Sequence, residues 1–472
     1  MRKTKIICTL GPAIDDYDKL KEMVQNGLNC CRLNFSHGTH EEHKVRIDRI
    51  KKLREDLDIS LPIMLDTKGP EIRVRDFKEG KIELKAGQEF TLTPSFSELG
   101  DETHVGLTYP DLAKYVKEGN KILIDDGLIQ LEVKKIDGKN VVCEVLNNGV
   151  VKNHKSINIP NVVVDMPYLS EVDKSDVIFG CEQGVDYVAA SFVRRKQDVL
   201  DMRKLLDENG GKQIKIICKI ENTEGVKNMD DIIEAADGVM VARGDLGVEI
   251  PFKLLPAVQK NMISKCYRAG KIVVTATQML DSMQQNPRPT RAEVSDVANA
   301  IYDRTSVIML SGESAAGKYP VESVRAMNDI ALATEEDINY KERFYNNNLD
   351  LGSDVLSTIC NSAVAASYQI NAKAIVCVTM HGLTAEKMAA YRPQCPIIAV
   401  VVDPKSYHQL GLAWNVLPVK AEVKSSTDEL ILYAQQKAKE TGLVKVGDKV
   451  IITGGAIAGC GITDTIKIHT IR

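Results

Sequence analysis

Eight short apolar runs, rich in β-branched residues, recur along the first 310 residues of the chain, and each leads into a polar or glycine-containing turn. The runs span residues 5–10, 30–35, 62–66, 186–192, 214–220, 238–242, 272–276 and 306–310. Continuous apolar runs of this length are typical of parallel strands that are buried on both faces. The pattern therefore indicates a fold of the α/β class.

Helix signals lie between these runs. Three pairs at capping-box spacing mark helix starts: Thr39 with Glu42, Ser170 with Asp173, and Thr290 with Glu293. Three glycines stand just beyond the expected helix ends: Gly27, Gly184 and Gly270. Eight strand–helix units favour a closed (β/α)8 TIM barrel. The alternative, a doubly wound open sheet, fits less well because no G-x-G-x-x-G follows the first run.

The regular spacing breaks once, between residues 66 and 170. Alternating patterns over residues 81–85 and 130–133, separated by Gly, Asn and Asp turns, predict a small β-barrel domain inserted after the third strand. An insertion at that rim would lie over an active site as a lid.

A further α/β domain is predicted beyond residue 340. A helix is expected over residues 355–368, with strands over 374–379, 397–402, 416–419 and 449–453. We therefore expect four segments: residues 1–69 and 167–340 for the barrel, 70–166 for the lid, and 350–472 for a C-terminal regulatory domain.

Composition restricts the classes of partner. The formal net charge is -4, and the 61 basic residues are scattered among 65 acidic ones without a basic stripe, which argues against nucleic acid. The eleven cysteines form no C-x-x-C pair, so we expect free, mostly buried thiols in a reducing compartment. No apolar run has the length of a signal peptide or a membrane span. A cytoplasmic enzyme without a membrane partner is the expectation.

Polar residues are concentrated where six of the predicted strands end, which is the rim that carries the chemistry of barrel enzymes. Lys219 and Glu221 are two apart on one strand and project to the same face. Asp245 follows the next strand. An ammonium group beside carboxylates suits a phosphate held next to Mg²⁺, which takes few carboxylates plus substrate oxygens. A structural Lys–Glu ion pair is the alternative for this pair taken in isolation.

A second group at the rim offers oxygen ligands only: Asn34, Ser36, Asp66 and Thr67. These oxygens suit a hard monovalent cation, and loop capping by Asn, Ser and Thr is an equally good explanation. His37 is expected to form hydrogen bonds in its loop, because no second His or Cys lies at metal-ligand spacing. His40 and His43 lie on a charged helix and are expected to be solvated.

Residues 312–319, Gly-Glu-Ser-Ala-Ala-Gly-Lys-Tyr, nearly match a phosphate-binding P-loop. Tyr319 stands where that loop needs a Ser or Thr hydroxyl for Mg²⁺, and Pro320 changes the entry to the following helix. The segment therefore does not predict a Walker-type nucleotide hydrolase.

Six motifs together resemble those of the pyruvate kinase family. They are RLNFSHG at residues 32–38, LDTKGPEIR at 65–73, KIEN at 219–222, RGDLGVE at 243–249, TQML at 277–280 and PRPTRAE at 287–293. The resemblance runs through the whole chain. It implies phosphoryl transfer from phosphoenolpyruvate to ADP, giving pyruvate and ATP, by a homotetramer with a barrel, a lid and a C-terminal domain.

The resemblance also implies roles for single residues in catalysis. Arg32 and Lys219 would hold the transferring phosphoryl group, and Lys219 would neutralise its charge in the transition state. Gly244, Asp245 and Thr277 would bind the carboxylate side of the substrate. Glu221 and Asp245 would hold Mg²⁺ or Mn²⁺. Thr277 or Ser311 would position the water that protonates the enolate.

The same resemblance assigns the remaining rim residues. Asn34, Ser36, Asp66 and Thr67 would hold K⁺, and Glu71 is the residue that marks K⁺-dependent relatives. The nucleotide would be bound by His37, Arg73 and the lid residue Lys155, with Asn34 and Ser36 beside it. The family's GVNLPG at the end of the lid reads SINIPN at residues 156–161, so a somewhat different lid geometry is expected.

A loop in the C-terminal domain is a candidate effector site. Residues 379–385 join a strand to a helix N-terminus, which favours phosphate binding through Thr379, Gly382 and Thr384. Met380 and Leu383 stand where relatives activated by sugar bisphosphate carry hydroxyl or basic residues, and the second candidate loop, residues 453–461, has no Arg or Lys. AMP, ribose 5-phosphate and other sugar phosphates therefore fit better than fructose 1,6-bisphosphate. A simple helix cap is the alternative.

Two rival functions are considered. One is a carbon–carbon lyase that acts on phosphoenolpyruvate or pyruvate with Mg²⁺; the lid, the cation cluster and the C-terminal domain count against it. The other is a non-catalytic metabolite sensor, which would be expected to lose Lys219 or one of the metal carboxylates.

Overall fold

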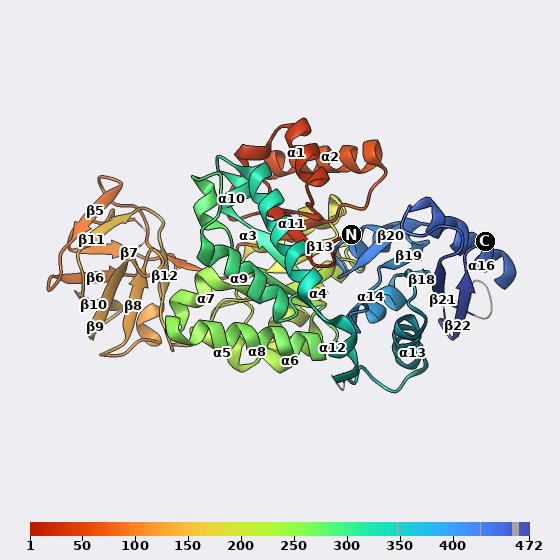
Figure 1. The fold of residues 1–472 in the computed structure, drawn as a ribbon. Helices are drawn as coiled ribbons and strands as arrows, with labels where there is room; N and C mark the ends of the chain where they lie inside the picture. Colours follow the sequence, from red (N-terminus) through yellow and green to blue (C-terminus); the bar gives the residue numbers. More distant parts are fainter. Residues whose placement is uncertain (96, 347–348, 425, 456–461) are drawn as a thin grey trace.

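A computed structural model describes residues 1–95, 97–346, 349–424, 426–455 and 462–472. Three regions follow one another in space (Figure 1). A β-rich lid lies on one side, the barrel and its helices are central, and the C-terminal domain lies on the side opposite the lid.

Eight parallel strands close into a barrel in the order β1-β17-β16-β15-β14-β13-β3-β2. Their bounds are β1 Lys5–Thr9, β2 Cys30–Asn34, β3 Ile63–Asp66, β13 Tyr187–Ala190, β14 Lys215–Ile220, β15 Gly238–Ala242, β16 Ile272–Ala276 and β17 Val307–Leu310. Each of these strands falls within one of the eight predicted runs. The predicted TIM barrel is confirmed, and the open sheet is excluded.

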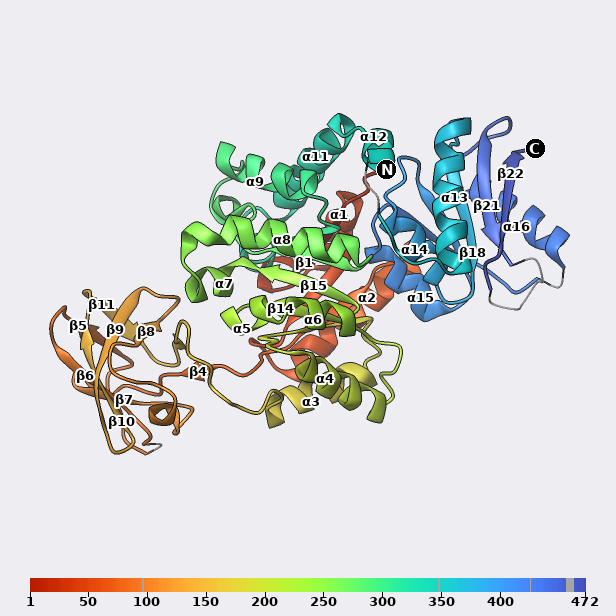
Figure 2. The ribbon, with the colours of Figure 1, turned by 90° about the horizontal axis from the view of Figure 1, so that it is seen from below.

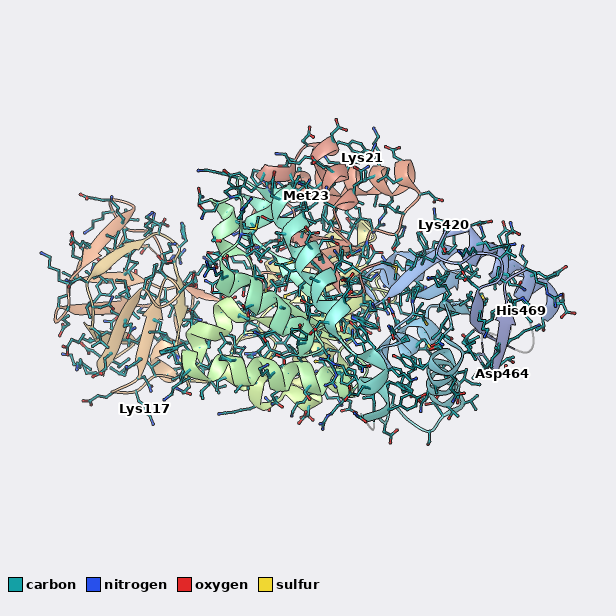
Figure 3. The ribbon with its side chains drawn as sticks, in the orientation of Figure 1. Lys21, Met23, Lys117, Lys420, Asp464 and His469 are labelled. Carbon is teal, nitrogen blue, oxygen red and sulfur yellow. The ribbon has the colours of Figure 1, made fainter. Side chains whose placement is uncertain are left out.

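Helices cover the outside of the barrel. They are α1 Tyr17–Gln25, α2 His40–Leu57, α3 Glu171–Glu182, α4 Lys196–Glu208, α5 Thr223–Lys227, α6 Met229–Ala235, α7 Arg243–Glu249, α8 Leu255–Arg268, α9 Arg291–Tyr302, α10 Gly312–Ala315, α11 Pro320–Asp337 and α12 Tyr340–Asn346. The three predicted capping boxes are present at the starts of α2, α3 and α9. In α1, Met23 is fully buried while Lys21 lies toward the outer surface (Figure 3).

The helix α2 shows that one prediction was wrong. His43 is 2% exposed rather than solvated, because it lies on the same face as Ile47 and Ile50, which packs onto the barrel. Its ring stacks on Phe35 with centroids 4.0 Å apart. His40 is half-buried and its Nε2 lies 2.6 Å from Asp176 Oδ1. The many charges of this helix concealed its apolar stripe.

The lid is an insertion with its own core. It comprises β4 Ile72–Arg73, β5 Lys81–Leu84, β6 Glu89–Thr93, β7 His104–Gly106, β8 Lys121–Ile124, β9 Ile129–Asp137, β10 Asn140–Val145, β11 Gly149–Lys152 and β12 Ser156–Asn158. These strands form a seven-stranded and a two-stranded sheet. Their buried side chains form an apolar cluster separate from that of the barrel. The segment around β4 links the lid to the barrel (Figure 2).

The C-terminal domain has a five-stranded sheet in the order β20-β19-β18-β21-β22. The elements are α13 Val355–Ile370, β18 Ala374–Thr379, α14 Leu383–Ala390, β19 Ile397–Val401, α15 Pro404–Gln409, β20 Val416–Lys420, α16 Thr427–Glu440, β21 Lys449–Gly454 and β22 Thr465–Thr470. The four predicted strands are present. The antiparallel edge strand β22 was not predicted, because its half-exposed alternating sequence differs from the continuous apolar runs of its neighbours.

The C-terminal domain also closes one end of the barrel. The side chains inside the barrel, among them Ile7, Met64 and Tyr187, form a cluster that includes Leu412 from the C-terminal domain. The Tyr187 hydroxyl donates to the Gln409 carbonyl at 2.8 Å. The N-terminal end of the barrel is therefore plugged, which leaves the C-terminal rim, beside the lid, for chemistry.

Candidate active site

Lys219 lies at the centre of the rim. Its side chain lies on the face of β14 that points into the barrel mouth, and Lys219 is 9% exposed. Its Nζ lies 3.0 Å from Asp66 Oδ1, 3.0 Å from Glu221 Oε1 and 2.8 Å from Ser191 Oγ. The ion pair between Lys219 and Glu221 that was considered as the structural alternative is thus present, but it is one part of a larger buried cluster.

In this cluster, burial and the oppositely charged neighbours shift the pKa values of Lys219 and Glu221 in opposite directions. Burial alone would lower the pKa of Lys219, but the carboxylates of Asp66 and Glu221 outweigh it and hold the pKa above its ordinary value. Burial raises the pKa of Glu221, and Lys219 counteracts this only in part. The backbone N–H of Phe192 donates to Glu221 Oε2 at 2.6 Å. Asp245 also raises the pKa of Glu221, so the rim carries three carboxylates, Asp66, Glu221 and Asp245, against the two cations Lys219 and Arg32. This excess favours binding of additional positive charge.

Arg32, at the end of β2, completes the cluster. Its Nε donates to Asp66 Oδ2 at 2.5 Å, and its Nη1 donates to Thr9 Oγ1 at 2.7 Å. Burial opposes ionisation of Asp66, but Arg32 and Lys219 together hold its pKa below the ordinary value. A single buried carboxylate thus aligns the two cationic side chains that were predicted to bind phosphate.

Thr277, after β16, has a strained backbone. Its φ is +67°, and the next residue, Gln278, has a φ of +52°. A positive φ is costly for a β-branched residue and is concentrated at functional sites. The Thr277 hydroxyl donates to the Ala276 carbonyl at 2.6 Å and accepts from the Gly244 N–H at 2.8 Å. This bond ties the ends of β15 and β16 together and places Thr277 beside the start of α7, where Asp245 lies.

The four oxygen-bearing residues lie on neighbouring elements. Asn34 and Asp66 are register partners on β2 and β3. Asn34 Oδ1 accepts from the Ser36 N–H at 3.1 Å, and Thr67 Oγ1 accepts from the Ser191 N–H at 3.1 Å. The group is therefore brought together at one side of the rim, next to Arg32.

The predicted nucleotide residues are divided between the barrel and the lid. His37 is exposed on the loop after β2. Arg73 is in β4, where its Nη2 lies 2.6 Å from Glu71 Oε2, and Lys155 Nζ lies 2.8 Å from Asp125 Oδ1. Residues 73 and 156 are register partners, so Arg73 and Lys155 share the base of the lid. The cleft between this base and the barrel is lined by residues that include Glu71, Phe192, Asp245 and Glu249.

Ser191 was missed in the sequence. Its hydroxyl contacts Lys219 Nζ, Asp66 Oδ1 at 3.2 Å and the Thr67 carbonyl at 2.6 Å. Its place near the end of the fourth predicted run, residues 186–192, was the available signal, because both neighbouring strands carry a polar residue of the site at their ends.

The candidate effector loop is only partly open to a ligand. The Gly382 N–H donates to Thr379 Oγ1 at 3.0 Å, and Gly382, with a φ of +84°, precedes α14. The Thr384 hydroxyl is buried and lies 2.6 Å from that of Thr463. Residues 456–461 of the second candidate loop lie outside the described part of the chain.

A closed barrel with an inserted lid and a buried lysine–carboxylate cluster at the covered rim defines a lidded TIM-barrel enzyme. Two family models match the sequence: "Pyruvate kinase, barrel domain" over residues 1–324 and "Pyruvate kinase, alpha/beta domain" over residues 357–469. The chain therefore belongs to the pyruvate kinase family, a family of phosphotransferases.

Individual relatives agree with this assignment. The chain is 48% identical to the pyruvate kinase of Clostridium acetobutylicum, with all of both chains covered. It is 48% identical to that of Geobacillus stearothermophilus, covering all of this chain and 80% of the relative. The crystal structure of a pyruvate kinase from Cryptosporidium parvum matches with a TM-score of 0.95 and 39% identity, over all of this chain and 96% of the other. None of the described helices is both long and apolar enough to cross a membrane.

Proposed function

We propose that this chain transfers the phosphoryl group of phosphoenolpyruvate to ADP, giving pyruvate and ATP, the last step of glycolysis. The observation that carries this proposal is the buried Lys219 ammonium, held 3.0 Å from both Asp66 and Glu221 at the covered rim. The family supports the same reaction, since its relatives are named pyruvate kinases.

Arg32 and Lys219 are assigned to the phosphoryl group. Both are aligned by Asp66, so their positive charges are fixed before the substrate arrives. The charge on a transferring phosphoryl group is stabilised mainly by such pre-positioned cations. Thr277 is assigned to the substrate's reacting end, with Gly244 and Asp245 beside its carboxylate. The hydrogen bond from the Gly244 N–H to the Thr277 hydroxyl holds Thr277 beside Gly244, the residue before Asp245.

Glu221 and Asp245 are assigned to Mg²⁺, or Mn²⁺ in its place. The donor set fits, because both residues are carboxylates at neighbouring strand ends, and the Asp245 side chain makes no hydrogen bond or ion pair with the residues the structure describes. Burial and Asp245 raise the pKa of Glu221, and a bound cation would offset both effects. The bound cation would polarise the phosphoryl oxygens and neutralise their charge. Asn34, Ser36, Asp66 and Thr67, which offer only oxygen donors, are assigned to K⁺.

The nucleotide is assigned to His37, Arg73 and Lys155, with Asn34 and Ser36 beside it. Arg73 and Lys155 now hold the carboxylates of Glu71 and Asp125 at the lid base. An incoming polyphosphate would compete for both cations. For protonation of the enolate, Ser311 is a candidate beside Thr277, since its buried hydroxyl has no partner among the described residues and is free to hold a water.

A coupled assay tests the reaction. With phosphoenolpyruvate, ADP, Mg²⁺ and K⁺ present, pyruvate should appear at a rate that depends on ADP, and ATP should appear with it in equal amount. Pyruvate release without ADP, or the formation of a carbon–carbon bond, would favour the lyase. Substrate binding without any turnover would favour the sensor.

Finer assignments belong to the same proposal. We assign residues 1–69 and 167–340 to the barrel, 70–166 to the lid and 350–472 to the regulatory domain. The separate apolar cluster of the lid supports the lid assignment, while the main apolar cluster runs from the barrel into the C-terminal domain. The enzyme is proposed to be a homotetramer, which sedimentation equilibrium can test.

We place the enzyme in the cytoplasm, where the ten described cysteines, all free, would stay reduced.

Regulation by a phosphorylated effector is proposed at the loop of Thr379, Gly382 and Thr384. The Gly382 N–H already donates to Thr379 Oγ1 and the Thr384 hydroxyl is bonded to Thr463, so the proposed contact is with the N-terminus of α14 that follows Gly382. A thermal-shift and activation screen with AMP, ribose 5-phosphate, glucose 6-phosphate and fructose 1,6-bisphosphate tests it. No response to any of these would leave the loop as a helix cap.

A further inference from the structure

A small cavity lies where the barrel meets the C-terminal domain, at the end of the barrel away from the lid. Three arginines line it: Arg304 after α9, Arg343 in α12, and Arg392 after α14. Aromatic rings complete the wall, from Tyr267, Tyr340 and Trp414. The region of α12 and α14 can be followed in Figure 1, between the barrel helices and the C-terminal sheet.

Only part of the Arg392 guanidinium group has hydrogen-bond acceptors. Its Nη2 donates to the Arg304 carbonyl at 3.1 Å and to Ser306 Oγ at 2.9 Å. Its Nε and Nη1 are shielded from solvent and have no hydrogen-bond partner among the described residues. Its guanidinium lies 4.4 Å from the Trp414 ring centroid, which stabilises the charge but accepts no N–H hydrogen bond of ordinary strength. Buried donors without a partner usually mark a bound water or ion.

Carboxylates are missing from this cluster. Within the described parts of the chain, none of the three guanidinium groups forms an ion pair with Asp or Glu. Arg343 donates to the Tyr302 carbonyl at 3.1 Å, and Arg304 lies 5.0 Å from the Tyr267 ring centroid. Glu335 is the nearest acidic influence on Arg392, but its oxygens accept from the Lys3 and Thr4 N–H groups. The positive charge is therefore compensated by aromatic rings, carbonyls and the Ser306 hydroxyl, without a paired carboxylate among the described residues.

The pKa values agree with excess positive charge. Burial lowers the pKa of Arg392 to about 10, and the neighbouring Arg304 also lowers it. Burial and then Arg304 lower the pKa of Arg343. An anion between these groups would reverse both effects.

We propose that this cavity binds one monatomic anion of the halide class, chloride being the obvious candidate in a cell. The cavity measures about 20 Å³, on the scale where one water needs roughly 10–15 Å³. Phosphate and organic anions are too large for it in this conformation. The Thr4 hydroxyl, buried and without a partner among the described residues, also lines the cavity and can donate to an anion. An anion is favoured over water because guanidinium N–H groups only donate, so a water could give one hydrogen to Thr4 but its other hydrogen would face the arginines.

Such an anion would join two domains. Arg304 and Arg343 belong to the barrel side of the junction, and Arg392 belongs to the C-terminal domain. The site would therefore strengthen the junction without contacting the rim, and it does not depend on the proposed reaction. A ligand that binds only the folded state raises stability in proportion to the logarithm of its concentration above Kd.

Anomalous scattering tests occupancy. Crystals of the full chain, grown without halide and soaked in bromide, should show an anomalous peak within the cavity, near Arg392 Nε and Nη1. A peak that is absent, with ordinary water density in its place, would overturn the proposal.

Thermal unfolding tests whether binding occurs in solution. When gluconate is replaced by increasing concentrations of chloride at constant ionic strength, the wild-type Tm should rise and then level off as the site fills. Arg343→Gln, whose side chain is only half-buried, should lose most of this rise, whereas the exposed Arg325→Gln should keep it. Arg392→Gln should abolish the rise in Tm. If Arg392→Gln does not fold, the response of Arg343→Gln to chloride tests the proposal instead. An equal, non-saturating response in Arg343→Gln and Arg325→Gln would overturn the proposal, since a bromide peak would then reflect binding at crystal concentration only.

Discussion

Two buried lysines lie at opposite ends of the barrel, and their surroundings shift their pKa values in opposite directions. Lys219, at the rim, is 9% exposed and Lys5, at the N-terminal end, is 5% exposed. Lys219 has two carboxylates within 3.0 Å, which hold its pKa above the ordinary value. Lys5 donates to the Val416 carbonyl at 2.8 Å, and burial lowers its pKa to about 7.

The difference shows that burial alone does not define a site for chemistry. At the rim the charge is kept on the lysine by carboxylates that can also hold other cations. At the base the lysine loses much of its charge, because a carbonyl and the distant Glu335 replace little of its hydration. The same residue type therefore serves as a fixed cation at one end of the barrel and as a packing group at the other.

Removing the rim lysine should have the largest effect. Lys219→Met is expected to lower kcat by about a thousandfold or more, because the charge that it supplies acts in the transition state. Binding of phosphoenolpyruvate, measured by fluorescence titration, should remain largely intact. Lys204→Met, an exposed lysine of α4, serves as the control. Turnover comparable to wild type in Lys219→Met would show that Lys219 does not hold the phosphoryl group.

The strained threonine should come next. Thr277→Ala removes the hydroxyl that joins Gly244 to Ala276, and we expect kcat to fall by about 100-fold. Thr277→Ser keeps the hydroxyl and should stay within about tenfold of wild type. Steady-state kinetics on both variants separate the hydroxyl from the backbone strain. Equal loss in the two variants would assign the effect to the backbone or the methyl group.

Exchange of the monovalent cation should have a smaller effect. The expectation rests on Glu71 and on the oxygen donors around Asp66. Replacing K⁺ by Na⁺ at constant ionic strength should lower kcat by roughly tenfold, or about 1.4 kcal/mol. Rates are compared in the coupled assay with choline as a third, inert cation. The same rate in all three salts would remove the K⁺ assignment.

Lys5, at the N-terminal end of the barrel, should make the free energy of unfolding depend on pH. With a folded pKa of about 7 and an ordinary pKa of 10.5, the unfolded chain binds the extra proton between these values. Stability should therefore rise as pH increases through this window, by up to about 2 kcal/mol between pH 7 and 9. Urea unfolding should show the rise in wild type and its loss in Lys5→Met, which should also be the more stable of the two at pH 7. An unchanged pH dependence in Lys5→Met would mean that Lys5 stays charged in the fold.

Much of the fold was accessible from the sequence, because buried parallel strands leave continuous apolar runs and capping boxes leave fixed spacings. The rim residues Lys219, Glu221 and Asp66 could be predicted for the same reason, since each directly follows or ends such a run. Ser191 and the buried His43 were not found. Ser191 was indicated only by its place near the end of an apolar run, and His43, on a helix rich in charges, carries no signal of burial until the neighbouring elements are placed.

The arginine cluster lay further beyond prediction. Arg304, Arg343 and Arg392 come from three separate segments of the chain, and none of them lies in a motif. Their convergence depends on how the C-terminal domain packs against the barrel, which is a property of tertiary contacts rather than of local pattern. The same holds for the pairing of Arg73 with Glu71, where two neighbouring charges gave no indication of whether they would bind each other or a ligand.

Leu412 shows that the barrel and the C-terminal domain share one apolar cluster. This side chain comes from the C-terminal domain, yet it completes the apolar interior of the barrel. The barrel segments alone therefore do not close this interior cluster: without the C-terminal domain, its N-terminal end would face water. The C-terminal domain therefore contacts the same interior cluster that Ile7 of β1, Met64 of β3 and Tyr187 of β13 form, and it supports these strands from within.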